Sequence, residues 1–186
     1  ILDIGSRGNM FNKKYKTTTL DVVEDADVKQ DLNKNQKLPF KDNSFDIVIM
    51  NQILEHLVNC DELIKEAKRV SKKYIFVGLP NEMTYGIRIK FLFGLRNWEG
   101  YKPYGHKHFF TIRSINSFIK HFFPDLKTIK SDEAGIFTGA GLLPYFIRDI
   151  LAKLKPPLFA GEIYYLMKNE KTKIKKQFKN RKNLSL

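Results

Sequence analysis

The stretch Phe-Asp-Ile-Val-Ile-Met at residues 45–50 indicates the fold most clearly in this sequence of 186 residues. It is a nearly continuous run of apolar and β-branched residues, which suits a strand buried on both faces of a parallel sheet. A similar run at 74–80 ends at a proline, and residues 61–70 between the two runs carry apolar side chains at helical spacing. A strand, a helix and a strand in this order predict an α/β fold with right-handed crossovers.

Weaker patterns extend this alternation in both directions along the chain. Thr111 is a suitable N-cap for a helix that ends near residue 123. The other predicted strands are at 1–4, 17–21, 27–31, 126–131 and 162–167, and the other predicted helices are at 51–57 and 143–154.

Acidic residues and glycines follow the early strands. Asp3, Asp21 and Asp31 stand at or near strand ends, where parallel α/β sheets bind nucleotide-like ligands. Asp21 comes 18 residues after Asp3, close to the spacing that places an acid on ribose hydroxyls in dinucleotide folds. Gly5 and Gly8 would let the backbone approach a ligand closely. The alternative is that these acids only cap turns or helices.

Several segments of the first 80 residues resemble the class I S-adenosylmethionine-dependent methyltransferases, in particular the large group called type 11. The segments that carry this resemblance are 2–8, 20–21, 30–32, 38–48, 54–57, 66–70 and 78–80, and the Leu-Pro-Phe to Phe-Asp block at 38–46 is the most specific of them. The resemblance implies a three-layer Rossmann-like sandwich, with a mostly parallel sheet and an antiparallel last strand. It also implies S-adenosyl-L-methionine as the cofactor.

The same resemblance implies roles for individual residues. The glycine loop would pass along the methionine part of the cofactor, Asp21 would bind the ribose, and Asp31 with the Leu32 backbone would hold the adenine amino group. Asn51 would stand where cofactor and substrate meet. The predicted cofactor-binding residues are therefore Asp3, Gly5, Gly8, Asp21, Asp31, Leu32 and Asn51.

Two histidines are candidate catalytic residues. His56 follows Glu55 after the fourth strand, and His106 lies in a Gly-His-Lys-His-Phe-Phe-Thr element similar to one found in sugar- and lipid-modifying methyltransferases. Either histidine could accept a proton from the methyl acceptor. The alternatives are a structural role for His56 and a helix-capping role for His106. We expect no metal site, because one Glu beside one His gives fewer than three protein ligands.

Length and charge set the organisation of the chain. Residues 1–168 are expected to form one methyltransferase domain, with a substrate-facing insertion at about 81–110. Residues 169–186 are expected to form a basic tail, since eight Lys or Arg accompany one Glu from 168 to 186 in a chain of net charge +13. This tail either binds an anionic partner or is simply solvated. Because the chain begins inside an apolar run, we expect residues upstream of Ile1 to be missing.

The expected function is O-methylation of a small-molecule, sugar, glycan or lipid-linked acceptor. Without an apolar run near 18 residues, and with Cys60 as the single cysteine, a cytoplasmic location is expected. The segment 142–154 either packs on the core or makes peripheral contact with a membrane. A nucleic-acid or protein methyltransferase is a second hypothesis, although the Asn/Asp-Pro-Pro-aromatic element of enzymes that methylate nucleic-acid amino groups is absent after the fourth strand. A non-catalytic binding or interaction protein with this fold is a third.

Overall fold

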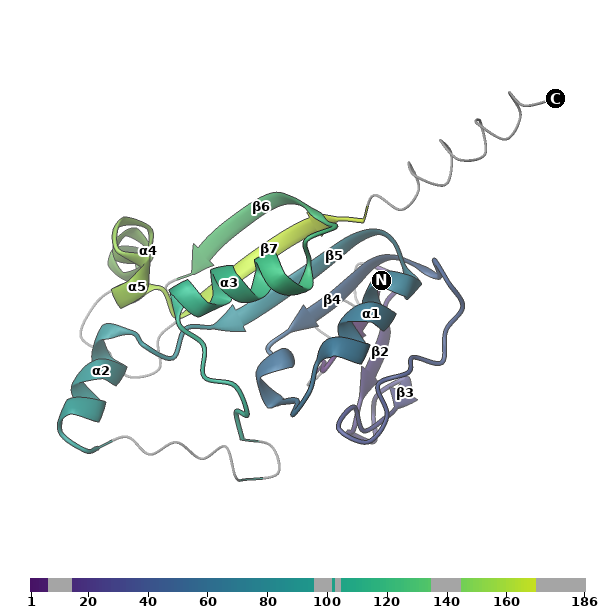
Figure 1. The fold of residues 1–186 in the computed structure, drawn as a ribbon, viewed down its shortest axis with the longest axis horizontal. Helices are drawn as coiled ribbons and strands as arrows, with labels where there is room; N and C mark the ends of the chain where they lie inside the picture. The colour runs from purple at the N-terminus through teal and green to yellow at the C-terminus, as the bar shows by residue number, and fades with distance from the viewer. Residues whose placement is uncertain (7–14, 96–101, 103–104, 135–144, 170–186) are drawn as a thin grey trace.

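A computed structural model describes residues 1–6, 15–95, 102, 105–134 and 145–169 (Figure 1). Its centre is one seven-stranded sheet in the order β3-β2-β1-β4-β5-β7-β6. Strands β1 to β5 are parallel to one another, and β7 is antiparallel to both β5 and β6. The strands are β1 (Leu2–Ile4), β2 (Thr18–Asp21), β3 (Val28–Lys29), β4 (Phe45–Asn51), β5 (Ser71–Pro80), β6 (Lys127–Ala134) and β7 (Glu162–Lys168). The α/β fold with a mostly parallel sheet and an antiparallel last strand is confirmed.

Two helices lie side by side on one face of this sheet, α1 (Asp61–Val70) and α3 (Ile112–Phe122) (Figure 1). The Lys68 side chain of α1 joins them by donating to the Phe122 carbonyl oxygen at 2.8 Å. At the start of α3, the Thr111 hydroxyl accepts from the Ser114 backbone N–H, and the Ser114 hydroxyl accepts from the Thr111 N–H. This capping box confirms Thr111 as the N-cap.

The core forms where α1 and α3 meet the central strands. Helix α1 turns one apolar stripe inward, as its sequence pattern predicts, and the charged side chains remain on its outer side. The fully or nearly buried residues of this stripe are Leu63, Ile64, Ala67 and Val70. The central strands bury a row of paired side chains on one face of the sheet, namely Leu2, Ile4, Val48, Met50, Ile75 and Val77.

The predicted helix at 51–57 is wrong. Asn51 still belongs to β4, and the Gln52 N–H continues the pairing by donating to the Gly78 carbonyl oxygen at 3.1 Å. Gln52 then adopts a positive φ of 55°, which turns the chain sharply away from the sheet. A single 3₁₀ turn, η1 (Leu54–His56), follows. Continued strand pairing therefore overrides the helical pattern at this position.

The remaining helices gather at one end of the molecule (Figure 1). They are α2 (Tyr85–Leu92), α4 (Tyr145–Leu154) and α5 (Pro156–Phe159). The predicted helix at 143–154 is present as α4, and Pro156 begins α5, because proline is tolerated at the first position of a helix. Helix α2 was not predicted. It buries none of its side chains, so its sequence carries no amphipathic pattern to detect.

The predicted basic tail begins with a residue that belongs to the folded part. The Asn169 side chain is 3% exposed and donates to the carbonyl oxygens of Lys68 and Ser71. Residues 170–186 lie outside the described residues.

Candidate functional site

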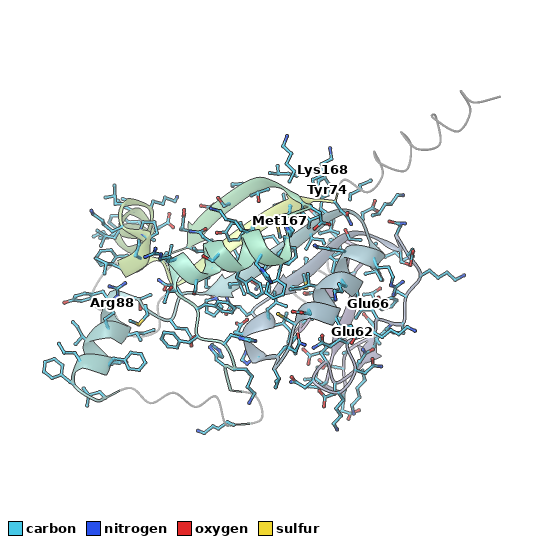
Figure 2. All side chains as sticks on the ribbon, in the orientation of Figure 1. Glu62, Glu66, Tyr74, Arg88, Met167 and Lys168 are labelled. Carbon is cyan, nitrogen blue, oxygen red and sulfur yellow. The ribbon has the colours of Figure 1, made fainter. Side chains whose placement is uncertain are left out.

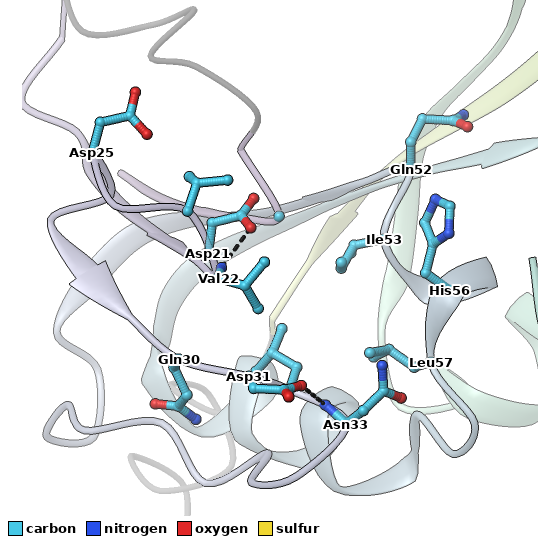
Figure 3. Close-up of a pocket in the computed structure, with 13 residues that line it drawn as sticks. Asp21, Val22, Asp25, Gln30, Asp31, Asn33, Gln52, Ile53, His56 and Leu57 are labelled. Carbon is cyan, nitrogen blue, oxygen red and sulfur yellow. Dashed lines mark hydrogen bonds between the residues drawn. The ribbon is translucent and has the colours of Figure 1, made fainter. Parts of the chain in front are cut away.

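A cavity of about 570 Å³ opens at the carboxyl ends of the early strands (Figure 3). The parallel pairing of β1 with β2 and β4 brings these ends to the same edge of the sheet. This edge is the usual ligand-binding position in an open α/β sheet. The lining residues are Gly5, Asp21, Val22, Val23, Asp25, Gln30, Asp31, Leu32, Asn33, Gln52, Ile53, His56 and Leu57.

Gly5 forms the turn that leaves β1. Its φ of +78° lies in the left-handed region, and its N–H donates to the Leu20 carbonyl oxygen at 2.8 Å. A Cβ at this position would lie 2.8 Å from the Ile53 Cβ on the opposite side. Conformation and space therefore both require glycine here. The close approach of the Gly5 backbone to a ligand stays a prediction.

Asp21 ends β2 and lines the cavity (Figure 3). Its Oδ1 accepts from the Val22 backbone N–H at 2.5 Å. No hydrogen bond in the described part of the chain involves its other oxygen. The half-buried Asp21 carboxylate can therefore accept a further hydrogen bond from a ligand in the cavity.

Asp31 and Leu32 form the lower wall of the cavity. The Asp31 Oδ1 accepts from the Asn33 N–H at 3.0 Å, and its carbonyl oxygen accepts from the N–H groups of Lys34 and Asn35. Asp31 therefore stabilises a turn, which was the structural alternative, and it also faces the cavity. Leu32 is 4% exposed and gives this wall an apolar surface.

Of the other predicted cofactor contacts, Asp3 and Asn51 do not line the cavity. Asp3 is 6% exposed on β1, and burial raises the pKa of its carboxyl, an effect that Ser6 opposes by hydrogen bonding. The Asn51 side chain fills the space beside Gly78, where a Cβ would lie 2.0 Å from Asn51 Oδ1. Gly8 lies outside the described residues. The roles of Asp3, Gly8 and Asn51 remain predictions.

The opposite wall comes from the turn after β4. Gln52, Ile53, His56 and Leu57 line it, and Asp21 and Asp31 lie across the cavity from Ile53 and His56 (Figure 3). Because Gln52 takes the left-handed turn, Gln52 rather than Asn51 reaches the lining.

The two candidate catalytic histidines lie against each other. The ring centroids of His56 and His106 are 4.7 Å apart, in an edge-to-face arrangement. Two backbone bonds hold the segment of His106 against η1, because the N–H groups of Lys107 and His108 donate to the Glu55 carbonyl oxygen at 2.6 and 3.2 Å. The sequence predicted each histidine separately, and the fold brings them together.

Glu82 orients His106. Its Oε1 lies 2.7 Å from His106 Nδ1, and its Oε2 accepts from the Phe110 N–H at 3.3 Å. The Glu82 side chain is only 7% exposed. An ionised carboxylate can only accept hydrogen bonds. Nδ1 of His106 therefore carries the hydrogen that faces Glu82, and the other ring nitrogen, Nε2, points away from Glu82. No sequence pattern marked Glu82, because its partner lies in a distant segment.

Glu55 is the most unusual residue of the site. Its side chain is fully buried, and neither carboxylate oxygen has a hydrogen-bond partner among the described residues. Burial raises the pKa of Glu55 to about 7, while the nearby His106 acts in the opposite direction. A buried carboxyl without a partner is costly and is typical of functional sites.

Part of this chain is similar to known sequences. Residues 7–75 match the family model described as a methyltransferase domain. Over 66 residues the chain is 40% identical to an uncharacterized protein of Methanocaldococcus jannaschii, a match that covers 34% of this chain and 32% of that protein. The chain thus corresponds to about a third of this curated relative.

Comparison with solved structures covers nearly the whole chain. A SAM-dependent methyltransferase of Archaeoglobus fulgidus has a TM-score of 0.60 and 19% identity, over 90% of this chain and 84% of that one. A SAM-dependent methyltransferase of Thermotoga maritima also has a TM-score of 0.60, with 16% identity, over 91% and 81% of the two chains. These likenesses establish the fold. Together with the family match, they imply S-adenosylmethionine as the cofactor.

Proposed function

We propose that this chain, whose residues 7–75 match the methyltransferase domain model, transfers a methyl group from S-adenosylmethionine to an oxygen of a small-molecule, sugar or lipid-linked acceptor. The observation that carries the proposal is the cavity at the strand ends, which has acids on one wall and His56 on the other. This arrangement puts groups suited to the cofactor opposite a group able to accept a proton.

The residues of the cavity fit this cofactor. Gly5 lines the cavity without a side chain, and Asp21 offers a carboxylate at the position where such folds bind ribose hydroxyls. Leu32 and Leu57 give apolar surface for a base, and Asp31 adds an acceptor for its amino group. Asp21, Asp31 and Leu32 are the residues that would hold the nucleoside.

The chemistry asked of the protein is positioning and proton removal. S-adenosylmethionine supplies a methyl group that is already activated by its sulfonium charge. The chain has to align the acceptor, exclude water and accept a proton from the acceptor hydroxyl. His56 lines the cavity and can accept that proton, while Glu82 fixes the ring of the adjacent His106.

The surface near α2 and α4 supports an acceptor with a lipid part. Helix α2 packs next to α5 through the Tyr85 and Phe159 rings, 6.3 Å apart, and Arg88 donates to the Pro157 carbonyl oxygen at 3.0 Å (Figure 2). Large apolar side chains on α2, α4 and the residues after α2 are more than half exposed, namely Leu92, Phe93, Leu95, Phe146, Ile150 and Leu154. Exposed apolar surface of this kind is typical of contact with a lipid or a partner. None of the described helices has the length and apolar composition needed to cross a bilayer.

A transfer assay tests this function. The protein is incubated with S-adenosylmethionine carrying a labelled methyl group and with sugars, lipid-linked glycans, RNA and protein as separate acceptors. We expect base-stable label on a sugar or lipid-linked acceptor, and a loss of roughly 10²-fold or more in rate in His56→Asn, as for removal of a general base. His121→Asn, which changes an exposed histidine on α3, is the matched control and should keep its rate. Label only on RNA or protein would contradict the proposed acceptor.

A further inference from the structure

We propose that Glu55, His56 and His106 bind a divalent transition-metal ion beside the cofactor cavity. One ligand atom from each of these residues lies within 4.8 Å of those from the other two. Two imidazoles and one carboxylate form the three-ligand set that catalytic metal sites commonly use. The sequence showed only the adjacent pair Glu55 and His56, and the third ligand comes from a segment that the fold brings beside them.

The Glu55 carboxylate is the independent evidence for a ligand at this position. Its side chain is fully buried, yet both oxygens lack a hydrogen-bond partner among the described residues. Native proteins almost always pair such groups, so an unpaired one calls for an explanation, and a bound ion is one that fits the ligands around Glu55. A bound cation would supply the partner that the Glu55 carboxylate lacks.

Glu82, which is not one of the three proposed ligands but contacts His106, supports the same conclusion. Metal-binding histidines usually donate their other ring N–H to a carboxylate, which fixes the ring and makes it a better ligand. The contact of 2.7 Å between His106 Nδ1 and Glu82 Oε1 provides this arrangement. The Phe110 N–H bond to Glu82 holds the carboxylate itself in place. Nε2 is then the atom of His106 that would bind the metal.

The geometry requires a small adjustment on binding. Metal–nitrogen and metal–oxygen distances of about 2.1 Å place ligand atoms roughly 3 to 4 Å apart. The ligand atoms now lie within 4.8 Å of one another, so the three side chains have to move slightly closer together when a metal binds. The His106 side chain is 33% exposed, so it has room to move.

The donor types narrow the choice of metal. Two imidazole nitrogens favour zinc, cobalt, nickel, iron or manganese over magnesium and calcium, which prefer all-oxygen sites. Three protein ligands also leave coordination positions open. Because His56 lines the cavity, an oxygen of the methyl acceptor can occupy such a position, a role that rests on the proposed function. In the metal-bound protein His56 is a ligand and not the base, and the metal would lower the pKa of the acceptor hydroxyl in its place.

Titration of the metal-stripped full chain with Co²⁺ tests the proposal, because bound cobalt reports its ligands through its visible absorption. We expect one equivalent to bind with new absorption bands, and the melting temperature to rise. Glu55→Gln keeps the side-chain volume and should abolish the bands, and so should His106→Asn. His121→Asn removes one of the two histidines that lie outside the cluster, and this variant should bind cobalt as the natural protein does.

Several results would overturn the proposal. They are no stoichiometric binding by the natural chain, bands that persist in both Glu55→Gln and His106→Asn, or bands lost equally in His121→Asn. Circular dichroism of each variant ensures that only folded protein is compared, and either cluster variant alone suffices if the other does not fold. The titration contains no cofactor, so its result does not depend on whether S-adenosylmethionine binds.

Discussion

At the scale of single residues, Gly5 shows why the cavity has its shape. The chain leaves β1 with a left-handed backbone, directly opposite Ile53, and both features exclude a side chain. A glycine in this position can be located from the sequence, because it directly follows a predicted strand. The identity of the opposing residue cannot, because Ile53 reaches it only after the turn that follows β4.

Replacing Gly5 by alanine should therefore destabilise the protein and obstruct the site. The positive φ and the approach of 2.8 Å to Ile53 Cβ lead us to expect a loss of about 1 to 3 kcal/mol in the free energy of unfolding. Urea denaturation measures this difference. Gly86→Ala in α2 is the matched control, since a Cβ there meets nothing within 4 Å and should be neutral or slightly stabilising. Equal effects of the two changes would contradict this account of Gly5.

At the scale of elements, Arg69 of α1 holds the loop before β4 in place. Its guanidinium donates to both Glu66 carboxylate oxygens at 2.7 Å and to the carbonyl oxygens of Leu38 and Phe40. The Leu38 N–H in turn donates to Glu66 at 2.8 Å. The specific sequence block at 38–46 thus owes part of its conformation to two charged residues on a helix that follows it in the chain.

This arrangement predicts a pH-dependent contribution to stability. The hydrogen bonds from Arg69 hold the pKa of Glu66 below its ordinary value of 4.5. A depressed carboxyl pKa stabilises the fold above the ordinary pKa, and this contribution is lost as the pH falls through the folded-state value. Glu66→Gln should therefore lower the free energy of unfolding by roughly 1 to 3 kcal/mol at pH 7, with the difference shrinking below about pH 4.5.

Denaturation curves at pH 7 and in acid measure the effect of Glu66→Gln. Glu62→Gln on the same helix is the control (Figure 2). Glu62 is exposed and is not among the residues to which Arg69 donates hydrogen bonds. A Glu66→Gln penalty that stays constant down to acid pH would show that the carboxylate charge does not matter there.

At the scale of the whole molecule, the sequence predicted the sheet better than the site. The run at 45–50 and the helix at 61–70 were found because burial imposes a regular apolar pattern on them. Helix α2 has no such pattern, since it buries nothing. The Gln52 turn escaped prediction because the pairing of β4 with β5 determines it, and that pairing is not local.

The same distinction explains the site. Gly5, Asp21 and Asp31 follow strands directly, so local patterns located them, and the structure places all three around one cavity. The cluster of Glu55, His56 and His106 depends on the packing of segment 105–110 against η1. Glu82 joins it from the residues after β5. No local pattern carries contacts of this kind, so only the folded chain shows them together.

The central claim is that the cavity binds S-adenosylmethionine through Asp21. Calorimetric titration of the full-length protein with S-adenosylhomocysteine, the product form of the cofactor, tests it most directly. Asp132→Ala is the matched control. Asp132 is exposed, and its strand β6 is at the opposite edge of the sheet from β2 and β3. We expect micromolar binding by the natural protein and Asp132→Ala, and at least tenfold weaker binding by Asp21→Ala, which loses hydrogen bonds to a charged group. Equal affinity in Asp21→Ala, or no binding by the natural protein, would contradict the claim.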